Sequence, residues 1–209
     1  MYLKVQALVL CVTEYNDTDA LLSLLTVQQG KLTAKVRGLR RKNSPMIAPC
    51  QLLAYSEFVL FENKGYYTVN EAHTIELFQP LRKDLSKLSL GTYFAQVAEL
   101  VSMEDTPNSE LLSLVLNCLY GLSSLDLPEN QVKAVFEMRA SMLLGFAPNV
   151  ERCAKCGGKS APQFYFSLPD GEVVCSRCRE RALREVMDLR GSVNEEELMD
   201  LNNPLVHVQ

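Results

Sequence analysis

Four cysteines in two close pairs place the strongest constraint on how this chain folds. Two residues separate the cysteines of each pair and eighteen residues separate the pairs, which are Cys153 with Cys156 and Cys175 with Cys178. Gly157 and Gly158 follow the first pair and permit the positive φ of a tight turn, so both sulfurs of a pair can point at one position. Two such turns would surround one metal ion with four thiolates. Because no coordination position stays open, the spacing predicts a structural Zn²⁺ ion.

The residues between the two pairs have the pattern of a zinc ribbon hairpin. Residues 163–168 alternate aromatic and polar side chains, residues 169–171 read Pro-Asp-Gly, and residues 172–174 return as a second strand. Two disulfides or two redox-active pairs are the alternative interpretations of the cysteines. Neither finds support elsewhere in the sequence, which shows no sign of secretion and no thioredoxin-like βαβ pattern around either pair.

The N-terminus lacks the features of a secretion signal, and no membrane span is recognisable. Residues 1–5 have no cationic start that leads into a long apolar segment. No apolar run reaches the roughly 18 residues that a membrane helix requires. We therefore expect a cytoplasmic protein without membrane association, with room in 209 residues for one large domain or two to three small ones. The remaining cysteines are expected to be buried as small apolar side chains; they are Cys11, Cys50 and Cys118.

Residues 1–80 have the pattern of an all-β domain. Short apolar or alternating runs predict five strands, at residues 5–12, 20–26, 31–36, 50–61 and 66–73. Gly30 and Gly65 mark hairpin turns before the third and fifth strands. Five short strands in this length favour a closed barrel of the oligonucleotide/oligosaccharide-binding (OB) type, with an SH3-like barrel as the rival. The leucine-rich second run also fits a helix.

The charge of the chain is unevenly distributed. The net charge is −4, yet residues 31–42 contain six cations and no acid: Lys31, Lys35, Arg37, Arg40, Arg41 and Lys42. Alternation along the third strand puts the first three on the outer face, and the other three lie in the following loop. This arrangement suits the phosphate backbone of single- or double-stranded DNA and predicts salt-dependent binding.

Aromatic residues near these cations offer faces on which bases could stack: Tyr55, Phe58, Tyr66 and Tyr67. The alternative interpretation of the cations is an edge strand protected by lysines against aggregation. Edge protection alone, however, does not require three consecutive cations in the next loop.

After Pro80 the apolar residues recur at helical spacing. Three helices are predicted, over residues 81–103, from Asn108 or Ser109 to about 122, and from the region of Pro128 to 145. Their apolar stripes must pack on one another or on the barrel. In the first helix this stripe is expected to contain Leu85, Leu88, Tyr93, Val97 and Leu100. In the third it is expected to contain Val132, Val135, Phe136, Met142 and Leu143, with Arg139 near it.

These patterns predict an α+β multidomain protein. Its parts are an OB-fold barrel (1–80), a helical bundle (81–148), a zinc ribbon inserted before a C-terminal helix (149–187) and an acidic tail (188–209). The C-terminal helix carries four arginines: Arg177, Arg179, Arg181 and Arg184. They are interpreted either as a second polyanion-binding surface or as a solvated helix face paired with glutamates.

Catalytic motifs are weakly represented. The two histidines lie far apart in sequence, and neither a nucleophile elbow nor a phosphate-binding or dinucleotide-binding glycine motif is present. Glu14, Asp17 and Asp19 lie close together, but their spacing matches no calcium loop. A metal-dependent nuclease that uses these acids is therefore kept only as an alternative, and we expect no enzymatic activity.

The chain resembles the RecO family of bacterial recombinational repair proteins. At the N-terminus the similarity lies in the runs Ala-Leu-Val-Leu (7–10), Glu-Tyr-Asn-Asp-Thr-Asp-Ala-Leu-Leu (14–22), Leu-Thr-Val-Gln-Gln-Gly-Lys-Leu (25–32) and Lys-Val-Arg-Gly-Leu-Arg-Arg (35–41). It recurs at Ser-Glu-Phe (56–58), at Leu-Leu-Gly-Phe-Ala-Pro (143–148), and at Phe166-Ser167 and Gly171. It extends over about residues 1–187, and it identifies the Tyr-Asn-Asp-Thr-Asp segment (15–19) as a family turn rather than a metal site.

The resemblance implies an OB-fold that binds single- and double-stranded DNA and anneals complementary strands coated with single-stranded DNA-binding protein. It also implies cooperation with RecR to load RecA. By the same resemblance the six cations of residues 31–42 match the DNA-facing region of the family, and the four cysteines match its zinc ligands.

From Met187 onward the sequence departs from this pattern. Family members usually continue through further helices that end in a basic Lys-Ser-leucine motif, whereas an acidic segment is found here. A site completed by those helices, including part of the surface for the tail of single-stranded DNA-binding protein, is therefore in question. The leading hypothesis is a non-enzymatic DNA-binding mediator, and the alternative is a zinc-ribbon adaptor that binds a protein partner.

Overall fold

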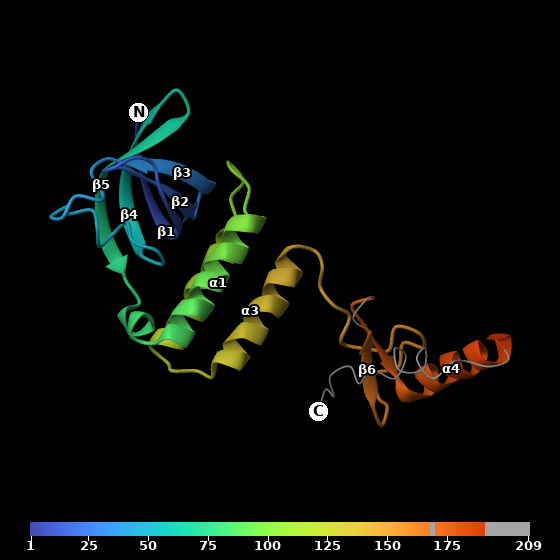
Figure 1. The fold of residues 1–209 in the computed structure, drawn as a ribbon. Helices are drawn as coiled ribbons and strands as arrows, with labels where there is room; N and C mark the ends of the chain where they lie inside the picture. Colours follow the sequence, from blue (N-terminus) through green and yellow to red (C-terminus); the bar gives the residue numbers. More distant parts are fainter. Residues whose placement is uncertain (168–169, 191–209) are drawn as a thin grey trace. The chain divides into compact units, whose positions relative to one another are not determined.

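The computed structural model describes residues 1–167 and 170–190, and the chain divides into two compact units. The first unit is Met1–Leu144, and the second begins at Gly145 (Figure 1). The predicted barrel and helices together make up the first unit, and the ribbon with its helix lies in the second. The predicted acidic tail lies mainly outside the described residues. No helix among the described residues is long and apolar enough to cross a membrane.

Five strands of the first unit form a closed barrel. They are β1 (Tyr2–Glu14), β2 (Ala20–Thr26), β3 (Gly30–Val36), β4 (Tyr55–Asn63) and β5 (Tyr66–Glu76), in the order β1-β2-β3-β5-β4 around the barrel. Antiparallel pairing joins all neighbours except β3 and β5, which run parallel. This closed five-stranded barrel is OB-like and confirms the predicted fold class.

Alternating burial along the strands explains why the sequence closes in this way. In β3 the residues Leu32, Ala34 and Val36 are buried while Lys31, Thr33 and Lys35 face outward. Leu22, Leu24, Phe58 and Leu60 complete the barrel interior with other apolar side chains. The leucine-rich run 20–26 is a strand, because it pairs with both β1 and β3 over its whole length. Strand pairing on both sides therefore decides against the helical alternative.

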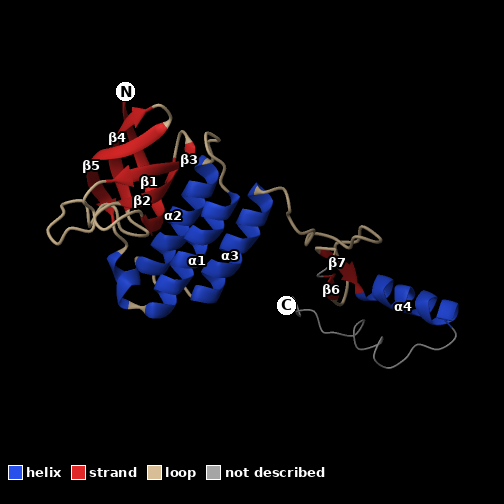
Figure 2. Cartoon of the chain, turned by 45° about the horizontal axis from the view of Figure 1, so that its top comes forward, coloured by secondary structure: helices blue, strands red, loops and turns tan. Residues whose placement is uncertain are grey.

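Three helices follow the barrel after the short 3₁₀ helix η1 (Gln79–Lys83). They are α1 (Leu85–Val101), α2 (Ser109–Ser123) and α3 (Glu129–Leu143), and Figure 2 shows them side by side next to the barrel. Asp84 caps α1 by accepting the backbone N–H groups of Ser86 and Lys87. Asn108 caps α2 by accepting the N–H of Leu111, as the sequence predicted.

The helices pack on one another and on the barrel through a second apolar core. Phe94 of α1 and Phe136 of α3 lie at its centre, with their ring centroids 4.2 Å apart. Leu8, Leu10 and Leu25 of the barrel belong to the same core. The first unit therefore contains two apolar clusters, one inside the barrel and one between barrel and helices.

The buried face of α1 agrees only in part with the predicted one, because Leu88, Tyr93 and Val97 pack partly buried against the core but the two end residues do not. Leu85 and Leu100 are 81% and 85% exposed, whereas the buried residues of the helix are Gly91, Phe94, Ala95 and Ala98. Small residues form this face because α1 lies close to its neighbours: a Cβ on Gly91 would be 3.0 Å from Leu119 and 3.1 Å from Leu53. In α3, similarly, Val132, Phe136 and Ala140 are buried, while Val135 and Met142 are exposed.

The second unit contains a two-stranded hairpin and one helix. Strands β6 (Phe164–Ser167) and β7 (Glu172–Cys175) pair antiparallel, and α4 (Ser176–Arg190) follows directly. The segment before the hairpin runs beside β7, where Asn149 exchanges backbone hydrogen bonds with Gly171 and Val173. The predicted ribbon hairpin is thus confirmed, and its helix continues three residues past the predicted end at Met187.

Candidate metal centre and nucleic-acid interface

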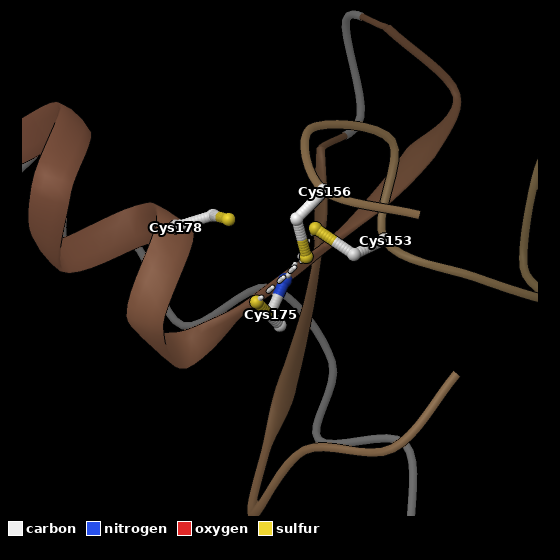
Figure 3. A group of neighbouring side chains, drawn as sticks. All are labelled: Cys153, Cys156, Cys175 and Cys178. Carbon is white, nitrogen blue, oxygen red and sulfur yellow. Dashed lines mark hydrogen bonds between the residues drawn. The ribbon is translucent and has the colours of Figure 1, made fainter. Parts of the chain in front are cut away.

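The four cysteines of the second unit meet at one position. Cys153 and Cys156 lie on the loop before the hairpin, Cys175 ends β7, and Cys178 lies in the first turn of α4 (Figure 3). Their sulfur atoms all lie within 4.8 Å of one another, and those of Cys156 and Cys175 are 3.8 Å apart. Metal–sulfur bonds of about 2.3 Å in a tetrahedron would separate the sulfurs by about 3.8 Å. The geometry therefore suits four ligands of one ion.

Backbone hydrogen bonds shape the first turn of this site. The N–H of Gly157 donates to the carbonyl of Cys153 at 2.8 Å, and the N–H of Cys153 donates to the carbonyl of Gly158 at 2.9 Å. Gly157 adopts a φ of +71°, a conformation that glycine accepts without strain. Gly158 does not use a positive φ, so one glycine of the predicted pair makes the turn.

The hairpin is joined to this turn by two more bonds. The N–H of Ala154 donates to the carbonyl of Val173 at 2.9 Å, and the N–H of Cys175 donates to the sulfur of Cys153 at 3.3 Å. These bonds hold the two cysteine pairs facing one another. Cys153 and Cys175 are buried, Cys178 is partly buried and Cys156 is exposed.

The electrostatics of the four thiols favour a bound cation. Burial opposes ionisation of Cys153, but backbone N–H groups of Cys175, Cys156 and Lys155 outweigh it and lower the pKa of this thiol to about 6. Hydrogen bonds with the thiols of Cys175 and Cys156 raise the pKa of Cys178 to about 12. One thiolate is thus favoured, whereas further negative charge beside it is not. A divalent cation would remove this conflict, since it binds the deprotonated form of every ligand.

Among the described residues, this is the single group of three or more cysteine, histidine or acidic side chains that could hold a metal ion. Two of the three acids considered for nuclease chemistry, Glu14 and Asp19, are engaged otherwise. Asp19 accepts hydrogen bonds from the backbone N–H of Gly38 and from the side chains of Asn16 and Thr18, and Glu14 pairs with Arg40.

The six cations of residues 31–42 differ in their surroundings. Lys31 donates from Nζ to the carbonyl oxygen of Glu99 at 3.1 Å, in the last turn of α1, where a cation interacts favourably with the negative end of the helix dipole. Its own N–H donates to the carbonyl of Met103 at 3.2 Å. Lys31 therefore joins the barrel to the helices, in addition to any role toward DNA.

Lys35 and Arg40 contact the turn between β1 and β2. Lys35 pairs with Asp19 at 3.0 Å and lies 4.4 Å from the centre of the Tyr15 ring. Arg40 pairs with Glu14 at 3.0 Å and donates to the carbonyl of Asn16 at 3.2 Å. These contacts, together with the bond from the N–H of Gly38 to Asp19 at 2.9 Å, fasten the 14–19 turn to the basic segment. We call this set of contacts the turn clamp.

The other three cations are exposed: Arg37, Arg41 and Lys42. Within the part of the chain that the structure describes, none of them forms an ion pair or a side-chain hydrogen bond. Arg37 directly follows β3, and the other two lie on the loop after it. These three charges are available to an anion from solution, and they sit beside the turn clamp.

The aromatic residues near the cations also separate into two groups. Phe58 is fully buried in the barrel. Tyr55 is partly buried against the core between barrel and helices, so neither ring is free. Tyr66 is 79% exposed. Tyr15, which sequence reasoning did not single out, is also exposed and lies beside Lys35. Its position depends on the meeting of two loops, which the strand pattern does not reveal.

The arginines of α4 are partly engaged with neighbours. Arg179 lies over the ring of Tyr165, 4.1 Å from its centre, and Arg184 is 4.0 Å from Glu180. Arg177 and Arg181 are exposed. The polyanion surface and the solvated helix face both stay predictions for this helix.

Comparison with known proteins adds the identity of the family. The family model described as Recombination protein O N terminal matches residues 1–78, and the model described as Recombination protein O C terminal matches residues 82–186. The chain belongs to the RecO family. The matched regions contain the OB-like barrel, the helices and all four cysteines.

Curated relatives agree with this assignment. The DNA repair protein RecO of Acetivibrio thermocellus is 38% identical over 179 residues, which cover 86% of this chain and 71% of the relative. The RecO proteins of Moorella thermoacetica and Alkaliphilus metalliredigens are 33% and 32% identical. These matches cover 91% and 85% of this chain, and 71% and 72% of the respective relatives. The resemblance inferred from the sequence is therefore confirmed.

Proposed function

We propose that this RecO family member is a non-enzymatic DNA-binding mediator of recombinational repair. It anneals complementary single strands and, with RecR, helps to load RecA onto strands covered by single-stranded DNA-binding protein. It acts in the cytoplasm at the nucleoid. Membership of a DNA repair family supports this proposal, and the observation that carries it is the group of exposed, unpaired cations Arg37, Arg41 and Lys42 beside the barrel.

The proposed DNA contact is electrostatic. Phosphates approach Arg37, Arg41 and Lys42, because these side chains have no acidic partner among the described residues that a phosphate must displace. Lys31, Lys35 and Arg40, the other predicted DNA-binding residues, add positive potential while they also hold the local structure. Two DNA strands whose phosphate charges are neutralised by these side chains repel each other less. Their complementary bases can then pair without any covalent step.

The proposed metal is Zn²⁺ in a structural role. Four sulfur donors around one point suit Zn²⁺, and a cluster of several iron atoms would hold its cysteine sulfurs farther apart than the observed 4.8 Å. Four protein ligands leave no position for a substrate. When bound, the ion stabilises the fold of the ribbon, by an amount on the order of 10 kcal/mol in comparable small sites.

The test of DNA binding is charge reversal on the loop. The triple variant Arg37→Glu, Arg41→Glu, Lys42→Glu is expected to bind a single-stranded oligonucleotide at least about tenfold more weakly at low salt. The affinity of the wild type should fall as the salt concentration rises. In the variant, the slope of the logarithm of the binding constant against the logarithm of the salt concentration should be shallower by about two units, because each of the three lost phosphate contacts contributes roughly 0.7. Fluorescence anisotropy over a salt series measures both quantities.

A matched single substitution controls for charge itself. Lys83 of η1 is exposed and lies outside the basic segment, so Lys83→Glu changes the net charge as much as Arg41→Glu does. Arg41→Glu should weaken binding more than Lys83→Glu. Equal binding by the triple variant and the wild type would refute the DNA contact and favour the adaptor hypothesis, in which the barrel serves as a scaffold.

A further inference from the structure

The turn clamp contains two carboxylates that are held very differently. The side chain of Asp19 is 14% exposed, and it accepts hydrogen bonds from a backbone N–H and two side chains in addition to its ion pair with Lys35. The side chain of Glu14 is 74% exposed. Its carboxylate contacts the guanidinium of Arg40 at 3.0 Å and forms no other hydrogen bond or ion pair with the described residues. Asp19 is therefore built into the turn, whereas a single surface contact holds the Glu14 carboxylate.

The position of Arg40 does not depend on the Glu14 carboxylate alone. The backbone N–H of Arg40 donates to the carbonyl of Thr18 at 3.0 Å. Its guanidinium also donates to the carbonyl of Asn16 at 3.2 Å. Both acceptors are backbone atoms of the 14–19 turn, so Arg40 would stay against this turn if Glu14 moved away.

A phosphate is a suitable replacement for the Glu14 carboxylate. Both anions accept parallel N–H bonds from a guanidinium. Arg40 lies in sequence between Arg37 and Arg41, which are exposed and form no ion pair in the described part of the chain. A phosphate at Arg40 would therefore be attracted by both neighbours as well. The exchange costs little, because an ion pair between two exposed side chains is weak.

We propose that Glu14 is an internal competitor of DNA, which occupies Arg40 in the free protein and gives way to a phosphate of the bound strand. Arg40 then becomes a fourth cation of the DNA contact, while Lys35 stays paired with Asp19. The inference rests on the proposed DNA-binding function and adds to it a residue that limits affinity. Every binding event must separate Glu14 from Arg40, so the protein holds DNA less tightly than its cations alone would allow.

The test measures the affinity of the full 209-residue chain for a single-stranded oligonucleotide, by fluorescence anisotropy at low salt. Glu14→Gln keeps the length of the side chain and removes the ion pair. This variant should bind roughly two- to fivefold more tightly than the wild type, the range expected for one exposed ion pair. Asp17→Asn is the matched control, because it removes one negative charge from the same turn at a residue without a partner in the described chain. Its gain should be smaller.

A second background tests whether the effect passes through Arg40. In a chain that carries Arg40→Gln, the further change Glu14→Gln should tighten binding no more than Asp17→Asn does. Thermal unfolding of the single variant Glu14→Gln should resemble that of the wild type, because the backbone contacts of Arg40 remain.

The outcomes separate this inference from the proposed function. Equal affinities of Glu14→Gln and Asp17→Asn would overturn it, because net charge alone would then explain the result. A gain that persists in the Arg40→Gln background would overturn it as well. In both cases the proposed function stands, provided that reversing the charges of Arg37, Arg41 and Lys42 weakens binding. If that reversal leaves the affinity unchanged, the proposed function itself fails.

Discussion

Asp19 is the residue on which the turn clamp depends. Its carboxylate accepts the N–H of Gly38 and pairs with Lys35, and Asn16 and Thr18 also donate to it. The N–H of Gly38, followed by the Lys35 and Asn16 side chains, holds the pKa of Asp19 far below its ordinary value, although partial burial opposes the shift. The acid is therefore a structural anchor of the basic segment.

Because its pKa is lowered in the folded protein, Asp19 stabilises the fold at neutral pH but not in strong acid. An unfolded Asp19 binds its proton at about pH 3.9, and the folded one only at much lower pH. The stabilisation is fully present above about pH 3.9 and is lost as the pH falls through the folded pKa. Asp19→Asn should lower the melting temperature at pH 7, and the difference from the wild type should shrink in strongly acidic buffer.

Asp17→Asn is the matched control for this prediction. Asp17 lies two residues away, is exposed, and forms no hydrogen bond or ion pair with the residues that the structure describes. Thermal unfolding followed by circular dichroism across pH compares the two variants. A melting temperature of Asp19→Asn that equals that of Asp17→Asn at pH 7 would show that the clamp adds no stability.

Sequence reasoning found the cations of this region but not their partners. The run of lysine and arginine is visible at residues 31–42. The pairing of Lys35 with Asp19 and of Arg40 with Glu14 depends on the β1–β2 turn lying against β3 and the loop after it, more than fifteen residues along the chain. No periodic pattern encodes such a meeting of loops, so half of the predicted DNA-binding residues proved to have internal contacts as well.

At the scale of elements, the β2–β3 hairpin and the α1–α2 loop meet at Gly30. This residue has a φ of +66°, and a Cβ there would lie 2.1 Å from the carbonyl oxygen of Thr106. Bridges from Gly30 and Lys31 to Glu104 run along the same contact. The helical part therefore approaches the barrel so closely that only glycine fits.

Gly30→Ala should accordingly destabilise the first unit by more than the strain of a positive φ alone. Gly65, at the tip of the β4–β5 hairpin, also has a positive φ, but no atom lies within 4 Å of the position that a Cβ would take there. Gly65→Ala should lose about 1–2 kcal/mol, and Gly30→Ala at least about 1 kcal/mol more. Urea unfolding of both variants measures the difference, and equal losses would argue against the close approach.

The elements themselves were largely predictable, whereas the faces of the helices were not. Alternation in β3 and the cap at Asn108 are local signals, and both are confirmed. The predicted face of α1 was right for Leu88, Tyr93 and Val97. It was wrong for Leu85 and Leu100, because large side chains were taken as the guide. Gly91, Ala95 and Ala98 are buried because their small size allows close packing, a property that depends on neighbours distant in sequence.

At the scale of the whole molecule, the division at Leu144 separates the metal centre from the barrel. All four cysteines of the site lie in the second unit, and the proposed DNA contact lies in the first. Each unit has its own interior contacts, so the ion is expected to stabilise the ribbon without supporting the barrel.

Cys175→Ser should therefore release the metal and loosen only the second unit. Elemental analysis should find one zinc per wild-type chain and none in this variant. Limited proteolysis with mass spectrometry should show faster cleavage within residues 145–190 and unchanged resistance within 1–144. Cys11→Ser, outside the site and partly buried, is the control. Iron in the wild type, or cleavage that increases equally in both units, would contradict the prediction.

The turn clamp has a consequence for how DNA would be captured. Side chains that must order themselves on contact lose conformational freedom, and that loss subtracts from affinity. The segment carrying Arg37 and Arg41 is already fixed by Asp19 at Gly38 and by Glu14 at Arg40. On contact with a DNA strand, the backbone beneath these arginines would therefore need little ordering, and the loss of freedom would be confined to the side chains of Arg37, Arg41 and Lys42.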